Sequence, residues 1–323
     1  MRRVGLTLVA LVLLVALGAP WLAPNPPDRS FPQSLYAPPT AVHLFDGSLR
    51  APFIYQQRLI SRLERRFEDD ESRRVALRWL SDGRLVTVPE EEGPLLLLGA
   101  DALGRDIFSR LVYGARASLA LALVATLAAL VVGAVVGAVA GYAGGVVDDL
   151  LSRVTEFVLV LPAMYVALAL RAALPLVLPP PAVFALLAVI FALLGWPIVA
   201  RGVRAIIVSE REREYVAAGH ALGAGPWRML AYHLLPSTTG YLMVQATLLL
   251  PAFILAEATL SYVGLGFPDS VPTWGTMLQD AANVSLVGRA PWMLAPAAAI
   301  FLVVLGVNLA IQGRGRAPVQ LEP

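Results

Sequence analysis

Few side chains in this 323-residue sequence have the types and spacing that catalysis needs. Cysteine is absent, which excludes disulfides, thiolate metal sites and cysteine nucleophiles. All 25 basic residues are arginine, so neither a standard P-loop nor a lysine Schiff base can form. The three histidines, His43, His220 and His233, include no His-x-x-x-His pair. We therefore expect no catalytic residues, no bound metal and no cofactor on this chain.

Glu257 is an acidic residue in, or at the end of, the apolar run Tyr241–Val263. An acidic side chain there is costly and usually faces the interior of a helix bundle or a water-filled path. Two interpretations stay open. Either Glu257, Ser261 and Tyr262 line a solute path or its outer gate, or Glu257 is a structural partner of nearby hydroxyls or of an arginine on another helix.

The composition places these residues in a membrane protein. Hydrophobic residues make up 58% of the chain, charged residues 15%, and the mean hydropathy is +0.70. Soluble domains carry about 25% charged residues, so the apolar excess predicts long runs that cross a bilayer. A formal net charge of +2 gives no sign of nucleic-acid binding.

Six apolar runs are each long enough to cross about 30 Å of hydrocarbon. The first is a cleaved signal peptide or a retained signal-anchor helix, and we favour the anchor because apolar character continues through Trp21 and Leu22. Gly133 and Gly137 in the second run have the spacing of close helix packing. The predicted fold class is an all-α polytopic membrane protein with six transmembrane helices. The runs are Val4–Ala23, Leu119–Ala140, Val154–Leu178, Ala182–Ile207, Tyr241–Val263 and Trp292–Ile311.

Charge concentrates between the first two runs, where residues 28–92 hold 21 of the 48 charged side chains. Ile60, Leu63 and Phe67 have helix spacing, whereas residues 84–88 predict a short strand. This enlarged extracytoplasmic loop is either a small subdomain or a loosely ordered loop. The predicted organisation is a signal-anchor helix at 1–24, the loop at 25–98, a five-helix domain at 99–312 and a cytoplasmic tail at 313–323.

Arginine in the short loops predicts the orientation, because arginine is enriched on the cytoplasmic side. With both termini in the cytoplasm, the short outer loops hold only Arg171 and Arg289. Arg105, Arg110 and Arg116 conflict with this arrangement, but loops longer than about 60 residues cross largely regardless of charge. The inner side then holds Arg2, Arg3, Arg153, Arg201, Arg204, Arg211, Arg213, Arg228, Arg314 and Arg316.

The longest polar break between late runs, residues 209–236, predicts two short helices with a turn between them. Gly223 to Pro226 is the turn, because glycine permits positive φ and proline fits a first helical position. We expect Pro236 to end the second helix. The acidic residues expected at the N-terminus of the first helix are Glu210, Glu212 and Glu214.

Apolar residues on the second of these helices give the segment two possible roles. Trp227, Met229 and Leu230 are expected to be exposed there. The segment is then either a docking knob for a partner protein or an amphipathic loop that lies on the membrane surface.

Part of this segment resembles the EAA loop of bacterial binding-protein-dependent ABC importers. The matching residues are Glu214-Tyr-Val-Ala-Ala, then Gly223, then Leu-Leu-Pro at 234–236, although Ser237 departs from the pattern. Four more blocks, in order, resemble dipeptide, oligopeptide and nickel permeases, and the likeness is closest to the second, C-type, permease subunit. They are residues 98–119, 141–149, 257–266 and 272–277 within a likeness that covers about 95–310.

The resemblance implies a type I ABC importer permease fold whose EAA loop forms the coupling helices that seat in a groove of the ATPase subunit. The residues carried over to that role are Glu214, Tyr215, Ala217, Ala218, Leu222, Gly223, Gly225, Leu230 and Pro236. It also suggests contacts with the binding protein on the outer face, although helix capping and local ion pairing explain Arg105 and Asp106 more simply. The outer-face candidates are Asp101, Arg105, Asp106 and Trp274.

The implied assembly contains a homologous second permease, two cytoplasmic ATPase subunits that use ATP and Mg²⁺, and an extracytoplasmic solute-binding protein, in the inner membrane. The implied cargo is di- or oligopeptides, with nickel or another small solute as the alternative. Two other classes fit less well. An ion-driven secondary transporter often shows inverted repeats, and an intramembrane serine protease needs a base beside its serine, whereas no predicted span contains histidine.

Overall fold

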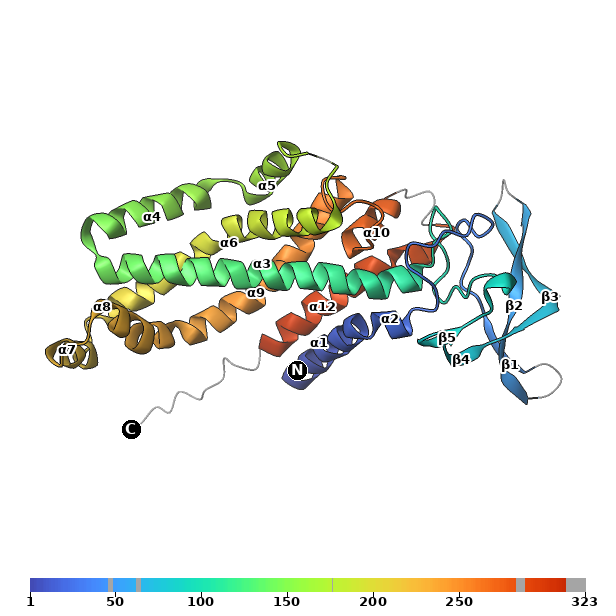
Figure 1. Ribbon diagram of the computed structural model, residues 1–323, viewed down its shortest axis with the longest axis horizontal. Helices are drawn as coiled ribbons and strands as arrows, with labels where there is room; N and C mark the ends of the chain where they lie inside the picture. The colour runs from blue at the N-terminus through green and yellow to red at the C-terminus, as the bar shows by residue number, and fades with distance from the viewer. Residues whose placement is uncertain (46–48, 62–64, 176, 283–287, 312–323) are drawn as a thin grey trace. The chain divides into compact units, whose positions relative to one another are not determined.

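The computed structural model divides the chain into two compact units (Figure 1). Unit 1 holds Met1–Leu119 and Ala258–Pro323, and unit 2 holds Ala120–Glu257. Two long helices, α3 (Ile107–Ala143) and α9 (Thr239–Tyr262), contribute residues to both units. The described residues are 1–45, 49–61, 65–175, 177–282 and 288–311, so the predicted tail 313–323 lies outside them.

Among the described residues, four helices are long and apolar enough to cross a membrane. A fifth span exists if α4 (Gly145–Val160) and α5 (Ala163–Ala172), which bend by 86° at their junction, count as one. The first predicted span is divided at Gly18 into α1 (Arg2–Leu17) and α2 (Ala19–Leu22). At 1.5 Å per residue, α1 alone is about 24 Å long. The four spans are Ile107–Ala143, Pro180–Glu210, Pro226–Tyr262 and Pro291–Ala310.

In unit 1, α1 packs along α12 (Ala295–Ile311). A Cβ added to Gly5 would lie 2.6 Å from the carbonyl oxygen of Gly306, so only glycine lets the two backbones approach this closely. Three more short helices lie among the described residues of unit 1. They are η1 (Glu90–Glu92), α10 (Trp274–Asp280) and η4 (Pro291–Leu294).

Unit 1 also contains a small β-subdomain, so the predicted all-α fold class is wrong for the strands that the structure describes between residues 42 and 87 (Figure 1). A three-stranded antiparallel sheet has the order β1-β2-β3, and β4 and β5 form a separate hairpin. The predicted strand at 84–88 is confirmed by β5. The strands are β1 (Val42–Phe45), β2 (Leu49–Ser61), β3 (Arg66–Ala76), β4 (Arg78–Ser81) and β5 (Arg84–Thr87).

The helix expected from Ile60, Leu63 and Phe67 is also wrong, because Ile60 lies in β2 and Phe67 in β3, while Leu63 lies outside the described residues. The sheet forms because its inner positions share one core, whereas a helix here would leave that core unfilled. The described part of the 25–98 region is thus a subdomain. Its core residues are Ile54, Val75, Val88 and Leu95, all at most 7% exposed.

In unit 2, α6 (Pro180–Glu210) packs against a seam of glycines on α3. A Cβ on Gly133 would lie 2.5 Å from Val199 Cβ, and one on Gly137 would lie 2.9 Å from Val203 Cβ. The predicted close-packing motif is therefore confirmed, and Gly141 extends it by one turn. The α6 residues at the centre of the unit are Leu187, Phe191, Val199, Val203 and Ile207, each at most 2% exposed.

Candidate functional site

The 209–236 segment forms the two helices and the turn that its sequence predicts. α7 (Glu214–Ala221) ends in a turn where Gly223 has φ +80°, a left-handed conformation that favours glycine. The backbone N–H of Gly223 donates to the carbonyl oxygen of His220 at 2.9 Å. Pro226 then begins α8 (Pro226–Arg228) at a first-turn position where no N–H is needed.

Pro236 does not end the second helix, contrary to the prediction. Residues Pro226–Tyr262 form one continuous helical run. The run includes the π-helical stretch η2 (Met229–Leu234) and the 3₁₀ stretch η3 (Leu235–Thr238) before α9. A proline inside a helix lacks an N–H and its ring presses on the preceding turn, and a widened π-turn relieves that pressure.

Two of the three acidic residues expected at the N-terminus of the first helix lie elsewhere in the structure. Glu214 lies in the first turn of α7 as expected, whereas Glu210 is the last residue of α6 and Glu212 lies between the helices. The Glu210 carboxylate instead accepts a 2.8 Å hydrogen bond from the Tyr215 hydroxyl and pairs with Arg213 at 3.3 Å. Glu210 therefore joins the end of α6 to α7.

The apolar residues of the segment divide into a buried and an exposed set. Met229 and Leu230, which we expected to be exposed, are 0% and 7% exposed. Met229 fills the space above Gly219, where an added Cβ would lie 2.6 Å from its Cε, so it joins α7 to the second helix. We call the exposed set the apolar knob, and it comprises Tyr215, Leu222, Trp227 and Tyr232, which are 41%, 89%, 79% and 76% exposed.

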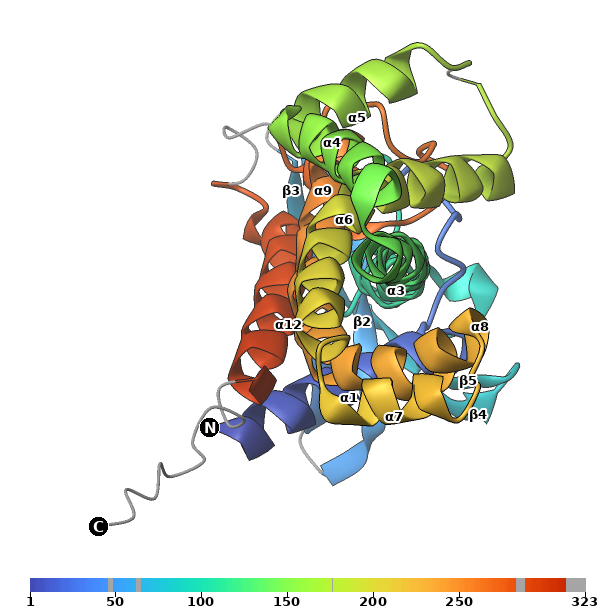
Figure 2. The same cartoon turned by 90° about the vertical axis from the view of Figure 1, so that its left-hand side faces the viewer.

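Contacts within unit 2 hold the 209–236 segment to the helix ends around it. Outside the segment, Arg204 Nη2 binds Asp148 Oδ2 at 2.6 Å and so joins α6, from which the segment continues, to α4. Arg211 Nη1 donates to the carbonyl oxygen of Gly141 on α3 at 2.9 Å. The ring of His220 on α7 stacks on Tyr142 at 6.5 Å between centroids. Figure 2 faces this end of unit 2, with α7 and α8 nearest the viewer.

The other residues carried over to the coupling role lie in the same segment. Ala217 and Ala218 are on α7, and Gly225 precedes Pro226, with nothing within 4 Å of the position of an added Cβ. Among the described residues, no three His, Asp or Glu side chains gather closely enough to hold a metal ion. The histidines lie in three different elements, His43 in β1, His220 in α7 and His233 in η2.

Glu257 and Ser261 lie near the C-terminal end of α9, and both side chains are buried. Their spacing of four residues places them on the same face of the helix. Tyr262, the third residue of the predicted gate, is 51% exposed and lies on a different face.

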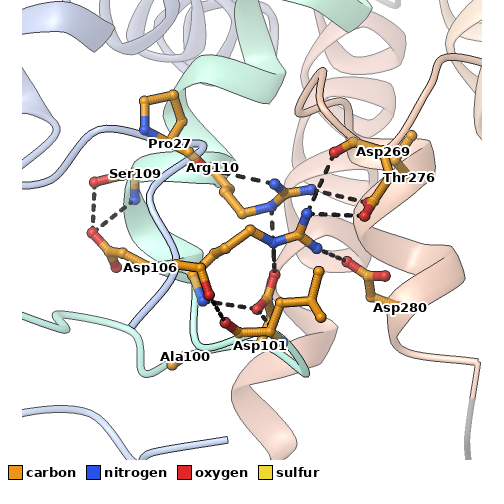
Figure 3. A network of polar contacts seen from close by, with 12 residues as sticks. Pro27, Ala100, Asp101, Asp106, Ser109, Arg110, Asp269, Thr276 and Asp280 are labelled. Carbon is orange, nitrogen blue, oxygen red and sulfur yellow. Dashed lines mark hydrogen bonds and ion pairs between the residues drawn. The ribbon is translucent and has the colours of Figure 1, made fainter. Parts of the chain in front are cut away.

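Unit 1 contains a second group of functional candidates, a polar cluster in which Arg105 and Arg110 contact Asp101, Asp269 and Asp280. Figure 3 labels Arg110 and the three carboxylates. Arg105 contacts all three carboxylates, with Nε 2.6 Å from Asp101 Oδ2, Nη1 3.1 Å from Asp269 Oδ2 and Nη2 2.9 Å from Asp280 Oδ2. Arg110 is 1% exposed. Its Nε lies 3.7 Å from Asp101 Oδ2, and its Nη2 lies 3.8 Å from Asp269 Oδ1. The ion pairs of the cluster connect the start of α3 and the segment before it to α10 and to the loop that precedes α10.

Burial and charge act in opposite directions on the polar cluster. Burial raises the pKa of Asp280 to about 6, against the lowering effect of Arg105. Burial disfavours the Arg105 cation, yet the three carboxylates, Asp101 above all, keep the pKa of Arg105 above its usual value. Arg105 is therefore the charge on which the group depends.

Asp106 caps α3, as the simpler interpretation of this residue expected. Its carboxylate accepts hydrogen bonds from the backbone N–H groups of Phe108 at 3.0 Å and Ser109 at 3.3 Å. It also accepts the Ser109 hydroxyl at 2.5 Å and the Asn25 amide at 3.0 Å. Burial nevertheless raises the pKa of Asp106 to about 6, against the lowering effect of these hydrogen bonds.

The four outer-face candidates do not form a surface, so the prediction that their side chains contact another protein is wrong. Asp101, Arg105, Asp106 and Trp274 are 3%, 5%, 0% and 1% exposed. Trp274 donates its indole N–H to the carbonyl oxygen of Leu111 at 3.1 Å. These residues hold α3, α10 and the chain before α3 together.

Sequence reasoning missed Arg110 as part of a buried ion cluster, and missed Asp269, Asp280 and Asn25 entirely. The i, i+4 spacing of Asp101 and Arg105 is a signal for their pairing. No local signal marks Asp269 or Asp280, which lie more than 160 residues along the chain from Arg105.

Comparison with known proteins identifies two families. Residues 133–313 match the binding-protein-dependent transport system inner membrane component. Residues 1–39 match the N-terminal TM domain of oligopeptide transport permease C.

Individual relatives are similar along most of their length. A di/tripeptide transport system permease protein of Pseudomonas aeruginosa is 32% identical over 306 residues, 94% of this chain and 83% of the relative. A dipeptide transport system permease protein of Escherichia coli K12 is 36% identical over 307 residues, 95% and 84% of the two chains. One from Alkalihalophilus pseudofirmus is 40% identical over 212 residues, 65% and 67%.

Proposed function

Because the chain belongs to the family of binding-protein-dependent transport system inner membrane components, we propose that it is the permease subunit of an ATP-driven importer of short peptides. It forms half of the translocation path and does not itself hydrolyse ATP. The peptide cargo is proposed from the names of the relatives, which are dipeptide and di/tripeptide permeases. Nickel or another small solute is the alternative cargo.

The observation that carries this proposal is the apolar knob on a helix-turn-helix that continues from α6 and contacts α3. Tyr215, Leu222, Trp227 and Tyr232 offer an exposed apolar surface, which suits burial in a groove of an ATPase subunit. Met229 and the Glu210–Tyr215 hydrogen bond keep the segment rigid. A movement of the ATPase is then passed to α6 and α3 through these contacts and the Arg211–Gly141 hydrogen bond.

The remaining parts of the assembly follow from the same proposal. The chain pairs with a homologous permease and receives solute from an extracytoplasmic binding protein. Both termini lie in the cytoplasm, six helices cross the membrane, with α1 and α2 as the first, and the 25–98 region is extracytoplasmic. Glu257 and Ser261 line the path or its outer gate, because a carboxylate in a membrane helix usually faces the bundle interior or a water-filled path, and Tyr262 borders that gate from a different face of α9.

The test is co-purification from native membranes in mild detergent. Gly223→Trp forces a bulky side chain onto a residue with φ +80°, in the turn of the 209–236 segment. Gly83→Trp is the matched control, because Gly83 also has a positive φ, of +72°, and nothing lies within 4 Å of its Cβ position. We expect an ATPase and a second permease to co-purify with the unmodified chain and the control, and the ATPase to be lost with Gly223→Trp.

A chain that purifies alone, or as a homo-oligomer indifferent to Gly223, would contradict the proposal and favour a self-contained, ion-driven transporter. Peptide cargo is tested separately, by uptake of labelled dipeptide against labelled nickel in cells that express the complete transporter. Uptake of nickel without uptake of peptide would show that the proposed peptide cargo is wrong, but it would not contradict the proposed role as a permease.

A further inference from the structure

One side of the middle strand β2 is only partly covered. β1 pairs with β2 between Leu49 and Ile54, whereas β3 pairs with it as far as Ser61. Figure 1 shows β2 and β3 continuing beyond β1. Among the described residues, no strand pairs with the β1 side of Tyr55–Leu59. Alternate backbone N–H and C=O groups of this stretch therefore face a side where another strand fits.

A groove lies along this stretch. A cavity of about 940 Å³ is bordered by Gln56–Leu59 of β2, by Pro32, Gln33 and Leu35, and by Asp70 and Arg73 of β3. A second cavity, of about 310 Å³, is lined by neighbouring residues, including Gln57. The Gln57 side chain donates to the carbonyl oxygen of Pro39 at 3.4 Å, and its own Oε1 is buried without a hydrogen-bond partner. Gln57 thus keeps a buried, unpaired acceptor at this stretch of β2.

The charges that line the large cavity are mainly positive, whereas Glu91 and Glu92 line the second cavity. Arg58, Arg65 and Arg73 line the large cavity with one carboxylate, Asp70. Asp70 Oδ1 accepts the hydroxyl of Ser72 at 2.5 Å, so this carboxylate already has a partner. The excess of guanidinium groups favours a ligand that carries carboxylates.

A β-bulge places one of these arginines. Tyr55 pairs with Arg74 and the next residue, Gln56, pairs with Asp70, so residues 71–73 loop out of β3. Arg73 in this loop donates to Gln56 Oε1 at 3.4 Å, across the strand pair. The bulge therefore brings Arg73 to the groove, where a regular strand would place it further along the sheet.

We propose that this groove binds an extended, acidic segment of a partner protein, which adds as a strand to the open edge of β2. The open stretch of five residues is about 17 Å long, which exceeds a di- or tripeptide, so a segment of another protein fits better than the cargo. Backbone hydrogen bonds to Tyr55–Leu59 give affinity, and Arg58, Arg65 and Arg73 select acidic side chains. This proposal rests on the proposed function in one respect only, namely that the partner lies on the extracytoplasmic side of the membrane.

The experiment measures peptide binding to the purified full-length chain in detergent, by fluorescence anisotropy. The probe is a labelled nine-residue peptide of alternating valine and glutamate. One control peptide replaces glutamate by lysine, and another carries N-methyl groups on alternate residues, which removes its backbone donors on one edge. We expect the acidic peptide to bind at least tenfold more tightly than either control.

Variants locate the site. We expect Arg58→Glu combined with Arg73→Glu to weaken binding of the acidic peptide at least tenfold, and Arg78→Glu, an exposed arginine on β4 outside the groove, to leave it unchanged. Arg73→Ala, in the looped-out residues, repeats the test without new charge, and a several-fold loss is expected.

Equal binding of the plain and N-methylated peptides would overturn strand addition, and binding indifferent to Arg58 and Arg73 would overturn the groove. Either failure leaves co-purification of the ATPase untouched, so it is distinguishable from failure of the proposed function.

Discussion

The apolar knob and the polar cluster use opposite physical chemistry. The apolar knob exposes large hydrophobic side chains, of which Leu222 is 89% exposed, and in the ion pair beside it the Arg213 side chain is 62% exposed and that of Glu210 is 20% exposed. The polar cluster buries two arginines, with Arg105 and Arg110 at 5% and 1% exposed. Exposed apolar surface is free to be covered by another protein, whereas buried charge must be satisfied inside the chain. The difference is the one expected between the proposed docking surface and an internal brace.

Removing the central charge of the polar cluster should have the largest effect. Arg105→Ala leaves Asp101 and Asp280 without their closest cation, and breaking a buried ion pair typically costs about 3–5 kcal/mol. The matched variant beside the apolar knob, Arg213→Ala, breaks a pair whose arginine is exposed and should cost about 0–1 kcal/mol. Denaturant unfolding of the purified variants checks both values. Similar losses in the two variants would erase the distinction between the regions.

The pH dependence of stability tests the burial of Asp106. Its pKa rises from 3.8 to about 6 on folding, so its contribution is fully present below pH 3.8 and is lost as the pH rises through 6. This loss in the free energy of unfolding is up to about 3 kcal/mol. Asp106→Asn keeps a good N-cap and cannot titrate, so its stability should fall less between pH 4.5 and 7. Thermal unfolding across this range measures the slopes, and parallel curves would contradict the burial of a titrating carboxyl here.

The glycine seam tests whether the apolar knob rests on a rigid support. In Gly137→Val the new Cβ overlaps the Ala200 carbonyl and lies 2.9 Å from Val203 Cβ, so the α3–α6 packing should lose about 1–3 kcal/mol. Gly240→Ala is the control, because nothing lies within 4 Å of its Cβ position and alanine favours a helix by about 1 kcal/mol. Unfolding midpoints compare the two. An unchanged midpoint in Gly137→Val would mean that α3 and α6 do not pack through this seam.

The smallest effect on stability is expected at the apolar knob. Trp227 is 79% exposed, so Trp227→Ala should change the free energy of unfolding by no more than about 0.5 kcal/mol. The same variant should reduce co-purification of the ATPase, because an aromatic anchor is lost from the interface. A large loss of stability would show instead that Trp227 belongs to the core.

Local patterns in the sequence predicted the parts of the structure that depend on local physics. The turn at Gly223 and Pro226, the Asp106 cap and the close packing at Gly133 and Gly137 follow from backbone conformation and residue size, and the structure contains them. Resemblance to permeases directed attention to the 209–236 segment, and the family membership agrees with it.

The parts that depend on distant residues were not predictable. Asp269 and Asp280 reach Arg105 only through the tertiary fold, so the sequence could not reveal that the outer-face candidates are buried. Met229 was expected outside because nothing local marks Gly219 as its partner. The β-subdomain was missed because a core shared among β2, β3 and the residues after β5 overrides the helix spacing of Ile60 and Phe67.

The most direct test of the docking surface uses the absence of cysteine, which leaves any introduced thiol alone in the chain. Leu222→Cys places a thiol at the most exposed position of the apolar knob, and Met229→Cys places one at a buried position of the same segment. In native membranes that contain the transporter, a thiol-to-amine cross-linker should join Leu222→Cys, but not Met229→Cys, to the ATPase subunit. No ATPase adduct from Leu222→Cys, while ATP-driven uptake remains intact, would contradict the assignment of this segment as the coupling surface.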